Sequence, residues 1–296
     1  MNPPTLLAWF NGRLVPADQP LLPLSDRGVL LGDSLFETIP VRHGLPFRWP
    51  NHLARLRVGA DLTGIHPPQD NPSLTRALIE LLSVNHAQHG SVRLTLTRGP
   101  GPRGYSPRDA GPPNVFFTWH PAPLPPHPQP GCHLVTAPFN IPANDPLAHA
   151  KHGSRLLNIL ARAHAEQAGA DDALLLDSHG HAAETAGANL FWFSRTTLCS
   201  PPDSAAALPG ITAHLIRSIA SSLGIRQARQ LITRDELARC DGLFLTVSTR
   251  GVVPVCSLDQ LPIPDHPNIL RLAQALSEIT DLECPAPIRP GNTPRS

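Results

Sequence analysis

The amino-acid sequence predicts an α+β protein of two domains. Both halves of the chain mix amphipathic helices with short strands, as α+β folds do. The proline-rich residues 121–130 cannot form a helix or a central strand, so we predict a semi-rigid connector there. No G-x-G-x-x-G motif follows a strand, and no P-loop is present. We therefore expect one domain over residues 1–120, a second over 131–284 and a loose tail over 285–296.

Before the connector, the sequence predicts a hairpin, two helices and two strands. Asn11-Gly12 is the strongest kind of short turn signal, so it should join the strands of the hairpin. Leucines recur on one face of the second helix, and Gly90 is expected to end it. Apolar and polar side chains alternate over the first strand, which should be half-buried. These elements are expected over residues 6–15, from 51 onward, and over 73–89, 91–98 and 115–119.

After the connector, predicted strands and helices again alternate. Residues 154–167 should form a helix whose apolar residues are Leu156, Leu157, Leu160 and Ala161. The other expected elements are strands over 132–137, 173–176, 190–193, 242–247 and 252–256, a helix over 210–223 and a capping box over 233–236.

Composition argues against several classes of function. The formal net charge of +1 does not suggest a surface for nucleic acid or another acidic polymer. No apolar run reaches the ~20 residues needed to cross a bilayer, and the first residues do not have the pattern of a signal peptide. Five scattered cysteines form no C-x-x-C pair, and the fifteen histidines show no metal-ligand spacing. We therefore expect a cytoplasmic protein with reduced thiols, no metal site and no membrane or nucleic-acid partner.

Lys151 is the only lysine of the chain, among 24 lysine and arginine residues. Arginine can replace lysine in solvated and ion-pairing roles, but it keeps its proton near neutral pH and cannot act as an amine nucleophile. Lys151 follows Pro142 and Pro146, so it should extend from a loop that precedes a helix. Its retention by drift is one interpretation. The other is a nucleophilic amine for a carbonyl, either of a substrate or of pyridoxal phosphate (PLP).

Binding of PLP has two further requirements, and the sequence contains candidate residues for both. Its phosphate needs a cation and the amides of a helix N-terminus, and its ring nitrogen needs an acid partner. Arg55 is a candidate cation, and residues 210–212 open a predicted helix. Glu184 lies in a loop of small residues, where a flat ring has room to approach. Ser248 and Thr249 add hydroxyls, although in isolation both also suit an ordinary turn.

The ordered motifs of the chain resemble those of fold type IV PLP enzymes, the class IV aminotransferase superfamily. This superfamily contains branched-chain aminotransferases, D-amino acid aminotransferases and aminodeoxychorismate lyases. The resemblance implies a two-domain α+β fold like that of D-amino acid aminotransferase, PLP as the cofactor and a homodimer. The matching stretches keep the family's order and cover residues 26–28, 32–38, 52–56, 151–163, 170–177, 184–191, 210–212 and 248–255.

The resemblance also implies a role for each residue around the cofactor. Lys151 would hold PLP covalently and move protons, and Glu184 would pair with its ring nitrogen. For Asp26, Arg27 and Asp33, the interpretation we favour is that they stabilise the loop under the site and do not touch substrate. The phosphate-binding residues would be Arg55, Ile211, Thr212, Ser248 and Thr249.

Two segments are most similar to aminodeoxychorismate lyases. Residues 98–105 follow the pattern R-G-x-G-x-R-G-Y, and residues 151–156 read K-H-x-x-R-L. The implied reaction converts 4-amino-4-deoxychorismate into 4-aminobenzoate and pyruvate, with Lys151 removing a ring proton and Thr38 supplying a hydroxyl near the leaving group. The residues implied to hold the two substrate carboxylates are Arg103, Tyr105, Arg155 and Arg250.

Two alternatives share the same fold. A D-amino acid or branched-chain transaminase would use the same cofactor and Lys151, although the turn over residues 248–252 departs from the turn of many transaminases. A PLP-binding relative without activity would not need to retain the only lysine.

Overall fold

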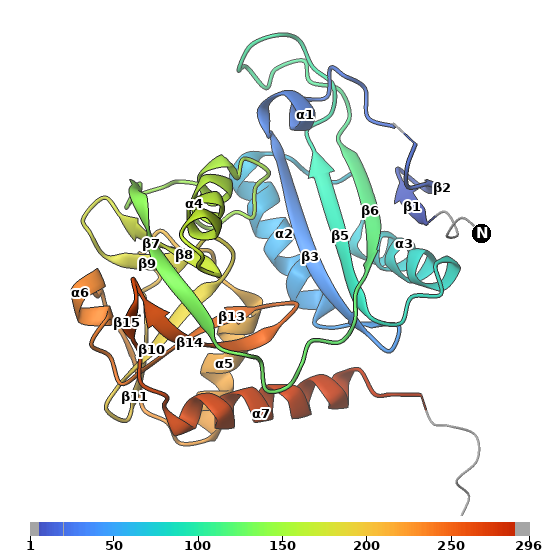
Figure 1. The fold of residues 1–296 in the computed structure, drawn as a ribbon. Coiled ribbons are helices and arrows are strands. Elements are labelled where there is room, and N and C mark those ends of the chain that lie inside the picture. The colour runs from blue at the N-terminus through green and yellow to red at the C-terminus, as the bar shows by residue number, and fades with distance from the viewer. Residues whose placement is uncertain (1–5, 20, 288–296) are drawn as a thin grey trace, which may run out of the picture.

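Two β-sheets lie side by side in the computed structural model, which describes residues 6–19 and 21–287 (Figure 1). The first sheet has six antiparallel strands in the order β2-β1-β6-β5-β3-β4. Its strands are β1 (Leu7–Phe10), β2 (Arg13–Pro16), β3 (Ser34–Arg42), β4 (Leu45–Pro46), β5 (Gly90–Thr97) and β6 (Asn114–Pro121). The helices of this half are α1 (Arg27–Leu31), α2 (Trp49–Thr63) and α3 (Asn71–Val84).

The second sheet has nine strands, and its main order is β12-β11-β10-β13-β14-β7-β8-β9. It mixes parallel pairs, such as β7 with β8, and antiparallel pairs, such as β10 with β13. Its strands are β7 (Cys132–Ile141), β8 (Asp172–Asp177), β9 (Ala182–Thr185), β10 (Asn189–Ser194), β11 (Thr197–Ser200), β12 (Gln227–Arg229), β13 (Gly242–Val247), β14 (Gly251–Leu258) and β15 (Leu261–Pro262). The helices are α4 (Leu156–Gln167), α5 (Ile211–Ser222), α6 (Arg234–Leu237) and α7 (Pro267–Glu283).

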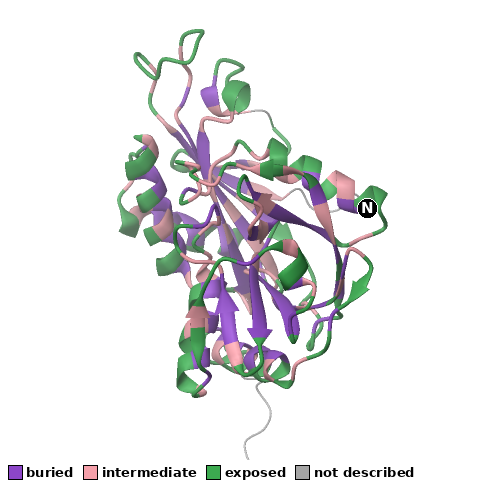
Figure 2. Cartoon of the chain, turned by 90° about the vertical axis from the view of Figure 1, so that its left-hand side faces the viewer, coloured by how far each residue is buried: buried purple, intermediate pink, exposed green. Residues whose placement is uncertain are grey.

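Each sheet has its own buried core, and burial concentrates on the strands and on the inner faces of the helices (Figure 2). The first core joins α2 and α3 to β3, β5 and β6. A second cluster packs α5 and α7 against one face of the nine-stranded sheet. No described helix has the length and apolar character needed to span a membrane.

Most of the predicted elements are present, and the hairpin is confirmed. Asn11 and Gly12 take positive φ values of 46° and 97°, as the tight turn between β1 and β2 requires. The capping box at α6 is also confirmed, with the side chains of Thr233 and Glu236 each capping the other residue's backbone. Pro121, the first residue of the predicted connector, instead ends β6, and residues 122–131 form no helix or strand. The tail predicted over 285–296 lies outside the described residues from 288 onward.

The prediction for the end of α3 is wrong by five residues, because Asn85 ends the helix. Its side-chain amide donates to Leu81 O at 2.9 Å and its Oδ1 accepts from Leu7 N at 2.9 Å, which ties the helix end to β1. Gly90 instead opens β5 with φ 149°, where a Cβ atom would collide with the carbonyl oxygen of His120.

The helix predicted over 154–167 is present as α4, and its burial differs along its apolar residues. Its buried residues are Ala161 and Ala165, whereas Leu156 and Leu160 are 71% and 56% exposed. The helix therefore packs on β7 and β8 through small side chains and leaves most of its large apolar residues on the surface.

Candidate active site

The segment that carries Lys151 lies along strand β3. Phe36 N donates to Lys151 O at 2.8 Å, and Gly153 N donates to Ser34 O at 2.7 Å. The Nζ atom of Lys151 lies over the ring of Phe36, 4.7 Å from its centroid. Backbone pairing with the first sheet thus holds this second-half lysine at the junction of the two sheets.

A cavity of about 310 Å³ opens at this junction, within the usual size range of small-molecule sites. Both halves of the chain contribute to its wall. Among the residues predicted to form the site, those that line it are Thr38, Arg55, Lys151, Arg155, Glu184, Thr212, Ser248 and Thr249.

The amine of Lys151 is prepared for chemistry near neutral pH. Burial and the positive charge of Arg55 lower its pKa to about 8, against the opposing effect of the Glu37 and Glu184 carboxylates. A substantial fraction of the amine is therefore unprotonated at a mildly alkaline pH, as a nucleophile or a general base requires.

One end of the cavity has the free helix amides and the cation that an anion site requires. Helix α5 begins after Gly210 with no side-chain cap, so the amides of its first turn, including those of Ile211 and Thr212, are free of a capping side chain. A Cβ atom at Gly210 would collide with the side chain of Asn189, so this helix start depends on glycine. Arg55 lies beside it and donates to Pro209 O at 3.1 Å.

Arg55 is held in place by Glu37, a residue to which the sequence analysis assigned no role. The Glu37 carboxylate accepts from Arg55 Nε at 2.8 Å, from its terminal nitrogen at 2.7 Å and from His52 Nδ1 at 2.7 Å. Burial alone would raise the pKa of Glu37, but hydrogen bonds from Arg55 and His52 outweigh burial and lower it. Burial lowers the pKa of His52 despite the Glu37 charge, so His52 is a neutral donor. The signal in the sequence that could have pointed to Glu37 was an acidic residue among the apolar residues of this segment.

Glu184, on β9, also lines the cavity. Its Oε2 accepts from Leu208 N at 2.9 Å, and its other oxygen accepts no hydrogen bond from the described residues. Burial raises the pKa of Glu184, and the Leu208 amide and the charges of Arg155 and Lys151 oppose that rise. A positively charged group in the cavity would stabilise the charged form of the Glu184 carboxylate.

Three residues predicted to bind substrate lie outside the cavity of their own chain. Arg103 and Tyr105 are on the exposed loop between β5 and β6, where Tyr105 is 88% exposed. Arg250 is also exposed, and its Nε donates to Gln129 Oε1 at 3.2 Å. Only Arg155 of this group contributes to the cavity wall.

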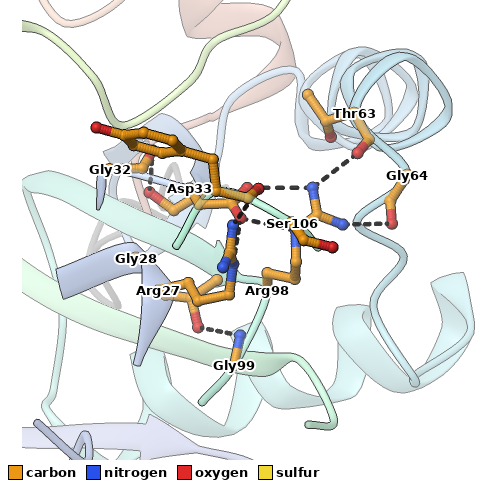
Figure 3. Close-up of polar contacts among 12 residues, drawn as sticks. Arg27, Gly28, Gly32, Asp33, Thr63, Gly64, Arg98, Gly99 and Ser106 are labelled. Carbon is orange, nitrogen blue, oxygen red and sulfur yellow. Dashed lines mark hydrogen bonds and ion pairs between the residues drawn. The ribbon is translucent and has the colours of Figure 1, made fainter. Parts of the chain in front are cut away.

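The loop that carries Arg103 and Tyr105 is anchored by a buried arginine (Figure 3). Arg27 is 3% exposed and donates to the carbonyl oxygens of Gly104 and Tyr105 at 3.0 and 3.1 Å. Its Nε also pairs with Asp33 at 2.9 Å, and Arg98 pairs with the same carboxylate at 2.7 Å. Arg27 and Asp33 therefore hold a loop in place and do not reach the cavity.

Comparison with known proteins decides the family. The family model for class IV amino-transferases matches residues 34–258, more than half of the chain. The chain belongs to the class IV aminotransferase family. A putative branched-chain-amino-acid aminotransferase of Methanocaldococcus jannaschii is 32% identical over 252 residues, which cover 85% of this chain and 87% of that protein.

Solved structures place this class IV aminotransferase chain in fold type IV. The 4-amino-4-deoxychorismate lyase from Pseudomonas aeruginosa is 32% identical and matches with a TM-score of 0.83, covering 93% of this chain and 100% of that one. The T.th. branched-chain amino acid aminotransferase, complexed with N-(5'-phosphopyridoxyl)-L-glutamate, is 29% identical with a TM-score of 0.87, covering 95% of this chain and 96% of that one.

Class IV aminotransferases use PLP, and the residues of this cavity fit that cofactor. Lys151 offers the amine, Arg55 and the start of α5 offer an anion site, and Glu184 offers an acid for the ring nitrogen. When bound, PLP supplies a carbonyl for the lysine and a ring that accepts an electron pair from the substrate.

Proposed function

We propose that this chain is a PLP-dependent 4-amino-4-deoxychorismate lyase that releases 4-aminobenzoate and pyruvate. The observation that carries the proposal is the shared position of Thr38 and Lys151 on one cavity wall. Thr38 is two residues from Phe36 on the same face of β3, and the Lys151 amine lies over Phe36. A base and a hydroxyl thus face the same space, as a reaction with one proton removed and one delivered requires.

In this proposal each residue has a separate task. Lys151, with its pKa lowered to about 8, removes the ring hydrogen next to the substrate nitrogen. Glu184, which lines the cavity, would pair with the ring nitrogen of the cofactor and favour its protonated form. The enolpyruvyl group leaves as its C–O bond breaks, and its methylene carbon gains a proton through the Thr38 hydroxyl. Because threonine is a weak acid, this transfer depends on a relay that reprotonates the hydroxyl.

Substrate carboxylates are assigned to arginine side chains. Arg155 lines the cavity, and burial lowers its pKa while Glu184 opposes that effect, so it is a half-buried cation within reach of a ligand. Arginine is suited to bidentate carboxylate contacts. The resemblance of the Arg103 loop to that of aminodeoxychorismate lyases supports a second carboxylate contact, delivered from another copy of the chain.

We infer a homodimer from the apolar surface near that loop. Leu30 on α1 is 61% exposed, and Leu156 and Leu160 on α4 are exposed as well. The end of α1 lies close to the segment that precedes α4, because a Cβ atom at Gly32 would lie 3.2 Å from Ser154. Clustered apolar side chains of this kind mark association surfaces. The loop of Arg103 is anchored to α1, so in the dimer it would reach the partner's cavity.

A branched-chain or D-amino acid transaminase is the second candidate. The observation in its favour is the 32% identity to a putative branched-chain-amino-acid aminotransferase. Lys151, Arg55 and Glu184 would serve both reactions, so the cofactor-binding residues do not separate them.

The experiment that separates the two candidates compares substrates. The holoenzyme is given aminodeoxychorismate alone, or an amino acid (D-alanine, L-leucine) with 2-oxoglutarate. The proposal requires consumption of aminodeoxychorismate. Consumption of the amino acids with 2-oxoglutarate, and none of aminodeoxychorismate, establishes the transaminase instead.

A further inference from the structure

A second cluster of ligand-type side chains lies on the turn between β8 and β9, outside the cavity. Asp177, His179 and His181 occupy alternate positions of this turn, and one ligand atom from each lies within 4.8 Å of the other two. The turn is fixed by its backbone, because Asp177 N donates to His181 O at 2.8 Å. These residues depart from the expectation, drawn from histidine spacing, that the chain has no metal site.

The carboxylate of Asp177 is held by hydrogen bonds to one of its two oxygens. Its Oδ1 accepts from the backbone amides of His179 and His181 at 2.8 and 2.9 Å. Its Oδ2 accepts no hydrogen bond from the described residues. The residue is 4% exposed, so the carboxylate is held at the base of the turn by two fixed donors. Carboxylates with one oxygen fixed in this way are suited to bind a metal through the remaining lone pairs.

His181 provides the independent observation that points to a ligand. Its Nδ1 atom is buried and has no hydrogen-bond partner in the described part of the chain. The atom lies 3.7 Å from Asp177 Oδ1, which is too long for a hydrogen bond. Two ligand atoms of a tetrahedral zinc ion are separated by roughly 3.4 Å, given metal–ligand distances near 2.1 Å. The carboxylate and the imidazole are therefore separated by about the distance between two ligands of one ion; because Oδ1 already accepts two backbone amides, Oδ2 is the oxygen left to bind it.

The third side chain is in a position to complete the group. The ring centroids of His179 and His181 lie 6.4 Å apart, and His179 is exposed, so its ring is free to rotate toward the other two residues. Glu236 adds negative charge near His181, although its carboxylate is used in the α6 capping box. Two imidazoles and one carboxylate favour zinc and similar transition metals over magnesium or calcium, which prefer oxygen ligands.

We propose that Asp177, His179 and His181 bind one divalent transition-metal ion of the zinc class. Water completes the coordination, because the turn supplies three ligands. The ion would pin the β8–β9 hairpin, whose second strand carries Glu184 three residues after His181. The role is structural, and the lyase or transaminase reaction does not require it.

The test uses zinc as the probe on PLP-loaded protein that has been treated with a chelator and desalted. Competition with a chromophoric chelator measures stoichiometry and affinity, in a Cys256→Ser background that removes the exposed thiol. We expect one equivalent to bind to the parent, and at least a tenfold loss of affinity in His179→Ala/His181→Ala. Asp177→Asn should also weaken binding, while its Oδ1 still accepts the two backbone amides. The matched control, His66→Ala/His214→Ala, removes two exposed histidines elsewhere and should bind as the parent does.

Two outcomes would overturn the proposal: no stoichiometric binding by the parent, or equal affinity in the His179/His181 variant. PLP absorbance and circular dichroism show whether each variant is folded. Zinc X-ray absorption of the loaded parent provides a test that needs no substitution, because it should show nitrogen and oxygen neighbours. Sulfur neighbours in that spectrum would place the ion elsewhere and contradict the assignment.

Discussion

Glu37 and Arg55 form a buried ion pair in which one carboxylate holds the guanidinium through two bonds, of 2.8 and 2.7 Å. The pair joins β3 to α2 and aims the arginine at the start of α5, where it donates to Pro209 O. Charge-assisted bonds of this geometry fix orientation as well as adding energy. The cation proposed to bind the PLP phosphate is therefore positioned by an acid on strand β3 of the same half of the chain.

We predict that Glu37→Gln weakens PLP binding by about tenfold. The neutral amide has one acceptor oxygen for the two Arg55 hydrogen bonds and carries no charge to pair with the guanidinium. Fluorescence titration of the apo protein with PLP measures the effect. Glu80→Gln, an exposed substitution on α3, is the control. Unchanged affinity in Glu37→Gln would show that Arg55 needs no such support.

The Glu37–Arg55 pair should make the free energy of unfolding fall at acidic pH. The pKa of Glu37 is lowered in the folded chain, so its contribution is present above the ordinary carboxylate pKa and is lost as the pH falls through the folded value. Urea unfolding of the apo protein should show a steeper loss of stability in acid for the parent than for Glu37→Gln. Parallel pH profiles would contradict the assigned shift.

Lys151 should cost the cofactor-free protein stability. Its pKa falls from 10.5 to about 8 on folding, so the unfolded chain binds the proton more tightly between these values. Apo Lys151→Met should be more stable than the parent by about 1–2 kcal/mol at neutral pH, after allowing for solvent screening. The difference should shrink as the pH rises from about 8 toward 10.5. A Lys151→Met variant that is less stable than the parent at neutral pH would mean that burial of the charged lysine does not destabilise the folded chain.

Glu184→Gln should keep PLP but lose at least about 100-fold in turnover, because the amide does not hold the ring nitrogen protonated. The visible absorbance of the variant reports its cofactor content, and initial rates report its turnover. Near parental turnover with full cofactor would remove Glu184 from this role.

The dimer proposal predicts complementation between two inactive chains. Arg103→Ala should lose substrate affinity, whereas Arg108→Ala in the same exposed loop should not. If Arg103 serves the partner's cavity, mixing Arg103→Ala with Lys151→Met chains rebuilds one intact site per mixed dimer and restores activity. If Arg103 acts within its own chain, no mixed site is complete and activity stays low. Size-exclusion chromatography with light scattering confirms that the chains have exchanged.

The sequence was most informative where a residue's chemistry cannot be replaced. Lys151 stood out because arginine cannot act as an amine nucleophile, and the structure places it in a cavity with Arg55 and Glu184. Residues that act through buried pairing were harder to predict. Strand β3 was not predicted as a strand, because Glu37 and Pro40 interrupt its apolar pattern, and Glu37 has no visible partner until α2 folds against it.

Surface features were the least predictable. Of the apolar residues of α4, Ala161 is buried, whereas Leu156 and Leu160 are exposed. One sequence cannot distinguish a core leucine from one that a second chain covers, because both satisfy the same periodicity. The role of the residues on the loop of Arg103 is equally hard to predict, because it also depends on whether a second chain is present.

Turnover of aminodeoxychorismate without an amino-group acceptor tests the central claim most directly. A lyase regenerates its starting form when pyruvate and 4-aminobenzoate leave, whereas a transaminase stops after one half-reaction unless a keto acid is supplied. The measurement counts pyruvate released per PLP site from aminodeoxychorismate alone, with Lys151→Met as the blank. We predict many pyruvate molecules per site in the parent and none in the blank. A parent that releases no pyruvate, yet steadily exchanges amino groups between an amino acid and 2-oxoglutarate, would contradict the account.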